Sequence, residues 1–155
     1  MSIRIEEILE MRVACFRHVG PYEQINEAFE RMTAYLEGKN VIGPDTKFLG
    51  IYHDDPETTP ASELRSDACF TVDESFQPEG GVKVMTIPSG TYAVYQHKGP
   101  YEELGNAWGL FCGKLLPEAG FKVREAPCFE IYMNCPDSVA PSELLTDIYE
   151  PVFPK

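Results

Sequence analysis

His18-Val19-Gly20-Pro21-Tyr22-Glu23 returns in the second half of the chain as His97-Lys98-Gly99-Pro100-Tyr101-Glu102. When the two motifs are placed in register, 16 of 49 aligned positions are identical. Unrelated sequences would match at roughly one position in seventeen, so the chain is a duplication. We assign the first copy to residues 3–72, the linker to residues 73–81 and the second copy to residues 82–152.

The residues around each motif predict a strand followed by a helix. Residues 13–18 and 92–97 are rich in β-branched and aromatic side chains. The Gly-Pro pair then ends the strand and starts a helix, because proline fits the first helical turn. Apolar residues recur at helical spacing after each motif, so each helix can bury one stripe: these are Ile25, Ala28, Phe29, Met32 and Leu36, and Leu104, Ala107, Trp108, Phe111 and Leu115.

Two further short strands follow each helix, and they complete a strand-helix-strand-strand unit. The sequence predicts an α+β fold of two such units, with pseudo-twofold symmetry, antiparallel sheets, a central groove and helices covering one face. An additional apolar stretch opens each copy, at residues 3–8 and 82–87. The pattern fits either a separate edge strand or the start of one long bent strand.

Composition limits the classes of function. Copies of about 70 residues bury little surface alone, so residues 1–155 are expected to form one domain with a shared core. The net charge of −12 argues against direct nucleic-acid binding. The chain starts without a signal peptide and has no bilayer-length apolar run, which predicts a cytoplasmic protein without membrane contact. Its five cysteines are an odd number and predict reduced, mostly buried thiols.

The copies differ at one informative place, where Gly50 of the first aligns with Glu130 of the second. Side chains alternate along a strand. If Phe129 and Ile131 pack beneath the helix, Glu130 and Tyr132 face the groove. The same alternation places Leu49 and Ile51 in the core, with Gly50 and Tyr52 on the groove side.

The second copy is also more aromatic, because Trp108 aligns with Phe29 and Tyr149 with Cys69. A carboxylate among aromatic rings suits an apolar or cationic ligand. The alternative is that Glu130 is an ordinary solvated strand residue. The predicted ligand-binding residues are Glu130, Trp108, Tyr132, Tyr149, Tyr52 and Gly50.

Other candidate chemistry finds little support in the sequence. His18 and His97 occur in both copies, which favours a structural role in the repeated turn over catalysis. His53-Asp54-Asp55 lacks a third ligand at metal spacing, and no Cys/His cluster suits zinc. There is no phosphate-binding glycine loop and no G-x-S-x-G serine. We therefore expect no metal, no cofactor and no assigned catalytic residue.

The repeated His-x-Gly-Pro-Tyr, residues 127–132 (Pro-Cys-Phe-Glu-Ile-Tyr) and residues 146–152 (Thr-Asp-Ile-Tyr-Glu-Pro-Val) resemble the GyrI-like family over nearly the whole chain. That family includes DNA gyrase inhibitor proteins and the effector-binding domains of AraC-type and MerR-type regulators. The resemblance implies a duplicated fold with a central groove, in which Glu130 matches a buried glutamate that receives organic cations. The chain has no residues left over for a DNA-binding segment and resembles a stand-alone member.

Three functions follow as alternatives. The first is a stand-alone binding module for small amphipathic or cationic compounds, with Glu130 as the charge partner. The second is an inhibitor or protector of DNA gyrase, acting through the acidic exterior. The third is a small hydrolase of electrophilic compounds in which Glu130 activates water, which requires burial to raise the glutamate pKa. Binding is favoured over catalysis.

Overall fold

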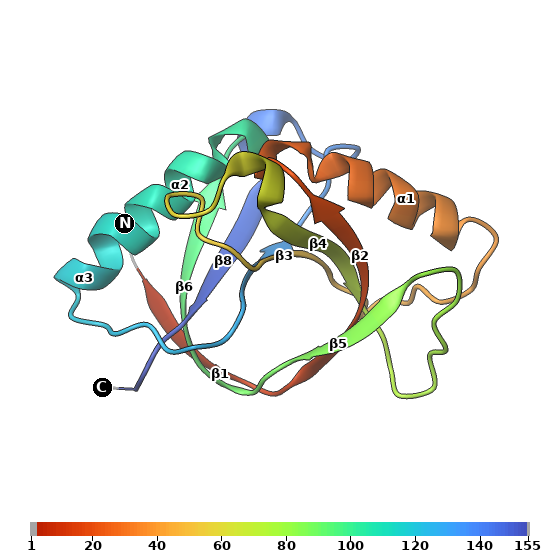
Figure 1. The fold of residues 1–155 in the computed structure, drawn as a ribbon, viewed down its shortest axis with the longest axis horizontal. Coiled ribbons are helices and arrows are strands. Elements are labelled where there is room, and N and C mark those ends of the chain that lie inside the picture. The colour runs from red at the N-terminus through yellow and green to blue at the C-terminus, as the bar shows by residue number, and fades with distance from the viewer. Residues whose placement is uncertain (1–2, 155) are drawn as a thin grey trace. The chain divides into compact units, whose positions relative to one another are not determined.

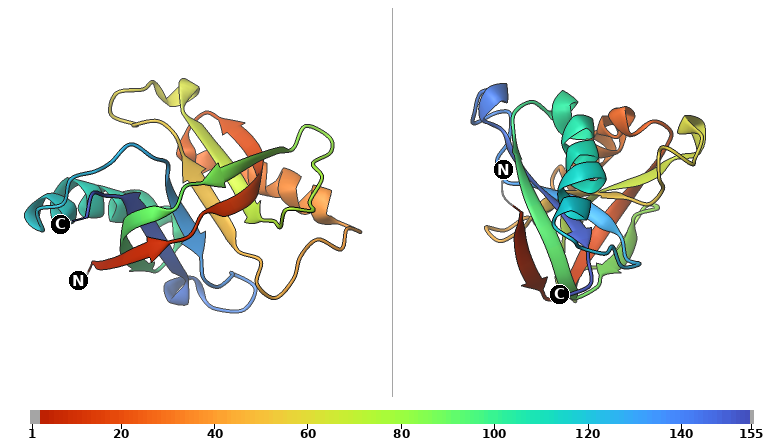
Figure 2. Two further views of the ribbon diagram at one scale, coloured as in Figure 1. Left: turned by 90° about the horizontal axis from the view of Figure 1, so that it is seen from below. Right: turned by 90° about the vertical axis from the view of Figure 1, so that its left-hand side faces the viewer.

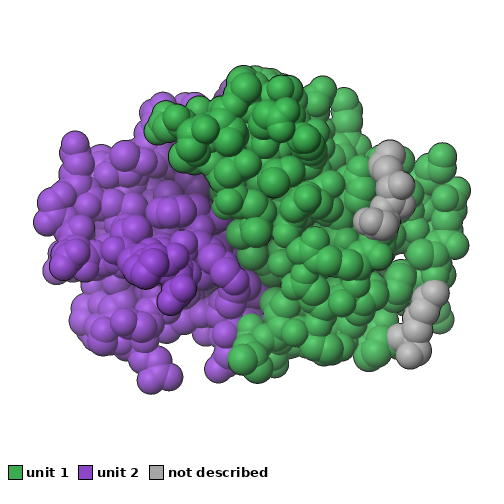
Figure 3. Space-filling model, turned by 180° about the vertical axis from the view of Figure 1, so that it is seen from behind, with its two compact units in different colours: residues 1–9, 89–155 green, residues 10–88 purple. Residues whose placement is uncertain are grey.

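The computed structural model describes residues 3–154, which divide into two compact units (Figure 3). Unit 2 consists of residues 10–88, and unit 1 combines residues 3–9 with residues 89–154. Each unit contains one copy of the motif and one antiparallel sheet with a helix on one face, as Figure 1 shows. The α+β class and the duplicated units with antiparallel sheets are confirmed.

Unit 2 has a four-stranded sheet in the order β5-β2-β4-β3. Helix α1 packs with its apolar stripe on β2 and β4, where Ala14, Phe16, Ala68 and Phe70 form the core with Met32. The elements are β2 (Met11–Val19), η1 (Tyr22–Gln24), α1 (Asn26–Leu36), β3 (Phe48–Tyr52), η2 (Ala61–Glu63), β4 (Arg65–Thr71) and β5 (Lys83–Ile87).

Unit 1 repeats this plan with the strand order β1-β6-β8-β7. Its helical segment is longer and contains a π-helical stretch, η4, just before Pro117. Proline has no N–H for the usual bond to the carbonyl four residues earlier. The elements are β1 (Arg4–Ile8), β6 (Gly90–Lys98), η3 (Tyr101–Glu103), α2 (Leu104–Leu110), η4 (Phe111–Leu115), α3 (Leu116–Glu118), β7 (Cys128–Tyr132), η5 (Pro141–Glu143) and β8 (Leu145–Pro151).

The repeated motif forms the same turn in both units. The ring of His18 is 3.0 Å from the Pro21 carbonyl oxygen through Nε2, and the Nε2 of His97 is 3.3 Å from the carbonyl oxygen of Pro100. The intervening glycine of the first turn, Gly20, has a φ of 133°, a conformation that side chains with a Cβ rarely adopt. The predicted hydrogen bonding of both histidines within the repeated turn is confirmed, and a structural rather than a catalytic role for them stays a prediction.

The apolar stretch that opens each copy is a separate edge strand, and it pairs with the other copy. Strand β1 pairs antiparallel with β6, and β5 pairs antiparallel with β2 (Figures 1 and 2). The connections Leu9-Glu10 and Pro88-Ser89 lack the Asn-Gly type of turn that folds a strand back on its neighbour. The chain therefore runs on, and each edge strand completes the sheet of the other copy.

The five cysteines, all within residues 3–154, are free thiols in the structure. Only Cys15 and Cys69 are buried, whereas Cys112 and Cys135 are exposed, so the expectation that most thiols are buried is wrong. Within the described part of the chain, none of the helices has the length and apolar character needed to cross a bilayer.

Candidate functional site

Glu130 lies in the middle of β7 with only 1 % of its surface exposed. Two neutral groups of unit 1 donate hydrogen bonds to its carboxylate. The indole Nε1 of Trp108 on α2 lies 3.3 Å from Oε2, and the hydroxyl of Tyr132 lies 3.1 Å from Oε1. Burial of a carboxylate is costly unless such donors are present, so the indole and the phenol stabilise the glutamate in this position.

The prediction that Glu130 and Tyr132 lie on the face of β7 away from the helix is wrong. Glu130 and Tyr132 point toward the helix, where Tyr132 and Trp108 pack on the helix-side core, and Phe129 points to the opposite face. Alternation shows which residues share a face but not which face carries the helix. Both faces of β7 are buried, with Phe129 at 0 % exposure on one face and Glu130 at 1 % on the other, so apolar character could not decide between them.

Tyr149 does not lie beside Glu130. Its ring stacks on Phe129 at 4.7 Å, in agreement with the register that pairs these two residues across β7 and β8. Its hydroxyl donates to Glu6 at 3.4 Å. The expected wall of Glu130, Tyr132 and Tyr149 is therefore divided between the two faces of the sheet.

Additional aromatic rings extend the site along the helix side of unit 1. Tyr101 contacts Tyr132 edge to face at 5.5 Å, and Phe111 lies 6.3 Å from Trp108. Burial raises the pKa of Tyr101, and the nearby charges of Cys135 and Glu130 act in the same direction. In the sequence, Tyr101 is part of the repeated motif that predicts a turn. Tyr101 lies directly before the helix that carries Trp108, and this closeness in sequence is the signal that could have placed its ring near Glu130.

The remaining predicted site residues belong to unit 2. Gly50 is buried in β3, and Tyr52 contacts Tyr22 edge to face at 4.8 Å. Their part in a common groove with Glu130 stays a prediction.

Each unit also keeps one buried hydroxyl on its helix-facing side. Thr146 stands opposite Tyr132 on the neighbouring strand, and Ser66 stands opposite Tyr52. Neither hydroxyl has a hydrogen-bond partner within residues 3–154. In unit 1 this leaves a polar group next to the glutamate layer that a bound molecule or water can satisfy.

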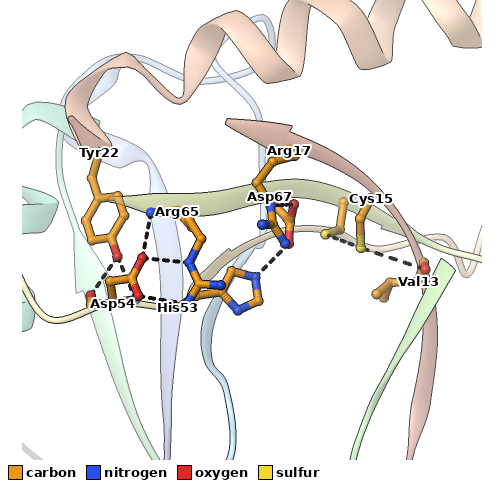
Figure 4. A network of polar contacts seen from close by, with 9 residues as sticks. Val13, Cys15, Arg17, Tyr22, His53, Asp54, Arg65 and Asp67 are labelled. Carbon is orange, nitrogen blue, oxygen red and sulfur yellow. Dashed lines mark hydrogen bonds and ion pairs between the residues drawn. The ribbon is translucent and has the colours of Figure 1, made fainter. Parts of the chain in front are cut away.

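A different polar network occupies the opposite face of unit 2 (Figure 4). Asp67 receives two hydrogen bonds from Arg17, at 2.8 and 3.2 Å, and lies 2.6 Å from Nε2 of His53. Burial alone would raise the pKa of Asp67, but the bonds from His53 and Arg17 outweigh it and lower the pKa. Unit 1 has the same buried acid, Asp147, paired with Arg4. Both units thus keep a buried acid with an arginine partner, which favours a structural role for this acid.

The fold and the site define a small α+β ligand-binding type of domain, with a buried carboxylate and aromatic rings under one helix. The model of the family described as "GyrI-like small molecule binding domain" matches residues 1–152. This chain belongs to the GyrI-like family.

Relatives and solved structures agree with this assignment. A DNA gyrase inhibitor of Erwinia billingiae is 35 % identical, covering 98 % of this chain and 97 % of the relative. The C-terminal domain of EcmrR has the same fold, with a TM-score of 0.83 and 20 % identity over 99 % of this chain and 98 % of that domain. SAV2435 bound to tetraphenylphosphonium has a TM-score of 0.66 and 14 % identity, covering 99 % of this chain and 94 % of that one.

Proposed function

We propose that the protein binds amphipathic organic cations at Glu130. The observation that carries the proposal is the buried carboxylate of Glu130, held by Trp108 and Tyr132, at a position where the duplicated unit has Gly50. The other unit folds without an acid there, so the fold itself does not require one. A buried charge that the fold does not need is typical of a functional site.

The chemistry of the site favours a cation with aromatic or other apolar parts. The carboxylate attracts positive charge, and the faces of Trp108 and Tyr132 add apolar contact and cation–π attraction. The family description names small-molecule binding, and one structural neighbour was solved with a lipophilic phosphonium cation. We place this function in the cytoplasm, which suits a chain with reduced thiols.

Trp108 makes the proposal directly testable, because it is the only tryptophan in the chain. Titration with tetraphenylphosphonium should change its fluorescence. Glu130→Gln keeps the shape and removes the charge, so affinity should fall by on the order of 1–3 kcal/mol, roughly 5- to 150-fold. Glu118→Gln, at an exposed position on α3, is the matched control and should leave affinity unchanged. Equal affinity of the wild type and Glu130→Gln would discard the proposal.

Inhibition of DNA gyrase is a second candidate function. It is favoured by the name of the 35 % identical relative and by the net charge of −12, which suits contact with a basic protein surface. Supercoiling by gyrase should slow in the presence of the protein, and Glu130→Gln should inhibit as well as the wild type if the acidic exterior makes the contact. Unchanged supercoiling at a saturating protein concentration would exclude this candidate.

A further inference from the structure

Two buried thiols stand opposite each other in unit 2, on the face of the sheet away from α1. Cys15 of β2 and Cys69 of β4 are Cα partners in the antiparallel register. The thiol of Cys69 donates a hydrogen bond to Sγ of Cys15, with the two sulfur atoms 3.1 Å apart (Figure 4). Cys15 is 4 % exposed, and Cys69 is fully buried. Each thiol therefore has another thiol in direct contact.

The positions of these two residues fit a disulfide without a change in the strands. Residues that stand directly opposite on antiparallel strands have Cα atoms about 4.5–5.5 Å apart. Disulfides join Cα atoms that are about 4.4–6.8 Å apart. Because an S–S bond is about 2.05 Å long, the sulfur atoms need to approach by only about 1 Å from their distance of 3.1 Å. Small rotations of the two side chains are enough to close this gap.

The sheet of unit 2 holds the two cysteines in this register. Strand β2 lies between β5 and β4, and β4 lies between β2 and β3, so both cysteines belong to strands that are paired on each side. Two residues further along the same face, the ion pair of Arg17 and Asp67 ties β2 to β4 a second time. Separation of the thiols would require the sheet to open.

The fold does not require thiols at these two positions. The aligned residues of unit 1 are Val94 and Tyr149, which are also Cα partners. Unit 1 thus builds the same strand pair without sulfur. An exposed thiol of unit 1, Cys135, has a different neighbour, because its Sγ lies 3.3 Å from the hydroxyl of Ser138. The contact between two thiols is therefore a feature that unit 2 adds to the shared architecture.

We propose that Cys15 and Cys69 are a redox modification site, at which hydrogen peroxide converts the two thiols into an intramolecular disulfide. The Cys15 sulfur attacks one peroxide oxygen, the O–O bond breaks, and the released hydroxide leaves as water with the thiol proton. The product is a sulfenic acid on Cys15. The Cys69 sulfur then attacks the sulfenic sulfur, so that the S–S bond forms and the S–O bond breaks. The second hydroxide leaves as water with the proton of Cys69.

The order of these two steps follows from the surroundings of the thiols. Burial raises the pKa of the Cys69 thiol, and the hydrogen bond to Cys15 acts in the same direction. Cys69 therefore stays protonated until a sulfenic acid forms beside it. Cys15 is the member of the pair with an exposed fraction, so it meets the peroxide first.

The disulfide would change the stability of the protein. It joins residues 54 positions apart and closes a loop that contains α1 and β3. Such a cross-link stabilises mainly by restricting the unfolded chain. Peroxide should therefore make the protein harder to unfold, whether or not a cation is bound at Glu130.

The test treats the native protein with hydrogen peroxide at neutral pH and then blocks the remaining thiols with iodoacetamide. Mass spectrometry of an unreduced digest should show a cross-linked peptide pair that contains Cys15 and Cys69, and dithiothreitol should remove it. Urea denaturation should show that oxidation lowers the equilibrium constant for unfolding on the order of 100-fold. Both effects should be absent in Cys15→Ser.

Cys15→Val, which copies the residue of unit 1, is a second variant that should fold and form no cross-link. Cys135→Ser is the matched control and should form the same cross-link with the same gain in stability. In the wild type, peroxide is raised until the exposed Cys135 is oxidised, which shows that the oxidant has acted. Oxidised Cys135 without a disulfide between Cys15 and Cys69 would overturn the site, as would cross-links that join only Cys112, Cys128 or Cys135. A cross-link without a gain in stability would overturn the assigned consequence.

Discussion

Unit 1 and unit 2 share one architecture but differ in the layer between helix and sheet. In unit 2 that layer is apolar, with Phe48 and Phe70 beside Gly50. In unit 1 the corresponding layer contains the buried Glu130, to which the Trp108 indole donates a hydrogen bond, and the partly buried Glu150 of β8, which aligns with Phe70. The duplication thus supplies an internal control, because one copy shows what the fold requires and the other shows what was added to it.

The largest expected effect comes from giving unit 2 the acid of unit 1. Gly50→Glu places a carboxylate under Phe29, which has no N–H to donate. An uncompensated buried charge should lower the free energy of unfolding by about 3–5 kcal/mol, measured by urea denaturation. Adding Phe29→Trp should restore about 1.5–3 kcal/mol through the new donor. A loss below about 1 kcal/mol in the single variant would show that the indole of unit 1 is not required to hold its glutamate.

A smaller effect distinguishes the two units by how the contributions of their acids to stability depend on pH. The pKa of Glu150 is raised, so its contribution to stability is complete below the ordinary glutamate pKa and is lost as the pH rises through about 7. Glu150→Gln should therefore stabilise the protein at pH 8 by about 2–3 kcal/mol and have little effect at pH 4. Asp67 of unit 2 has a lowered pKa and the opposite sign, since its contribution is lost as the pH falls. Parallel stability curves of wild type and Glu150→Gln from pH 5 to 8 would contradict this assignment.

The smallest effect should be equal in the two units. His18→Phe and His97→Phe each remove the ring nitrogen beside the proline carbonyl of the repeated turn. Each should lower the free energy of unfolding by about 1 kcal/mol and leave the affinity for tetraphenylphosphonium unchanged. A selective loss of binding in His97→Phe would make this histidine part of the site and end the equivalence of the two turns.

Much of this fold could be predicted from sequence because its signals are local. The Gly-Pro pair ends a strand and starts a helix, and the helical spacing after it marks the buried stripe. The importance of Glu130 was visible from its alignment with Gly50. The face of β7 that carries the helix was not predictable, because Phe129 and Ile131 on one side and Trp108 on the other make both faces buried.

The second acid was also missed, for a different reason. Glu150 aligns with Phe70 as plainly as Glu130 aligns with Gly50, but it belongs to a terminal segment that was interpreted only as a strand. Cys112, which affects the pKa of Glu150, lies in the π-helical stretch η4, and helical periodicity does not reveal that stretch. Contacts between elements distant in sequence decided what local patterns could not.

The exchange of edge strands bears on how such a chain arose. Ile8 pairs with Gly90, and Met11 pairs with Ile87. A shift of 79 positions carries Ile8 onto Ile87 and Met11 onto Gly90. The two pairs are therefore equivalent between the two copies. Before the gene was duplicated and fused, a half-length ancestor with this topology would have completed its sheet only by lending its first strand to an identical neighbour. In a fused chain, unlike in such a homodimer, a mutation alters one half alone, and an acid present at position 130 but absent at Gly50 requires that freedom.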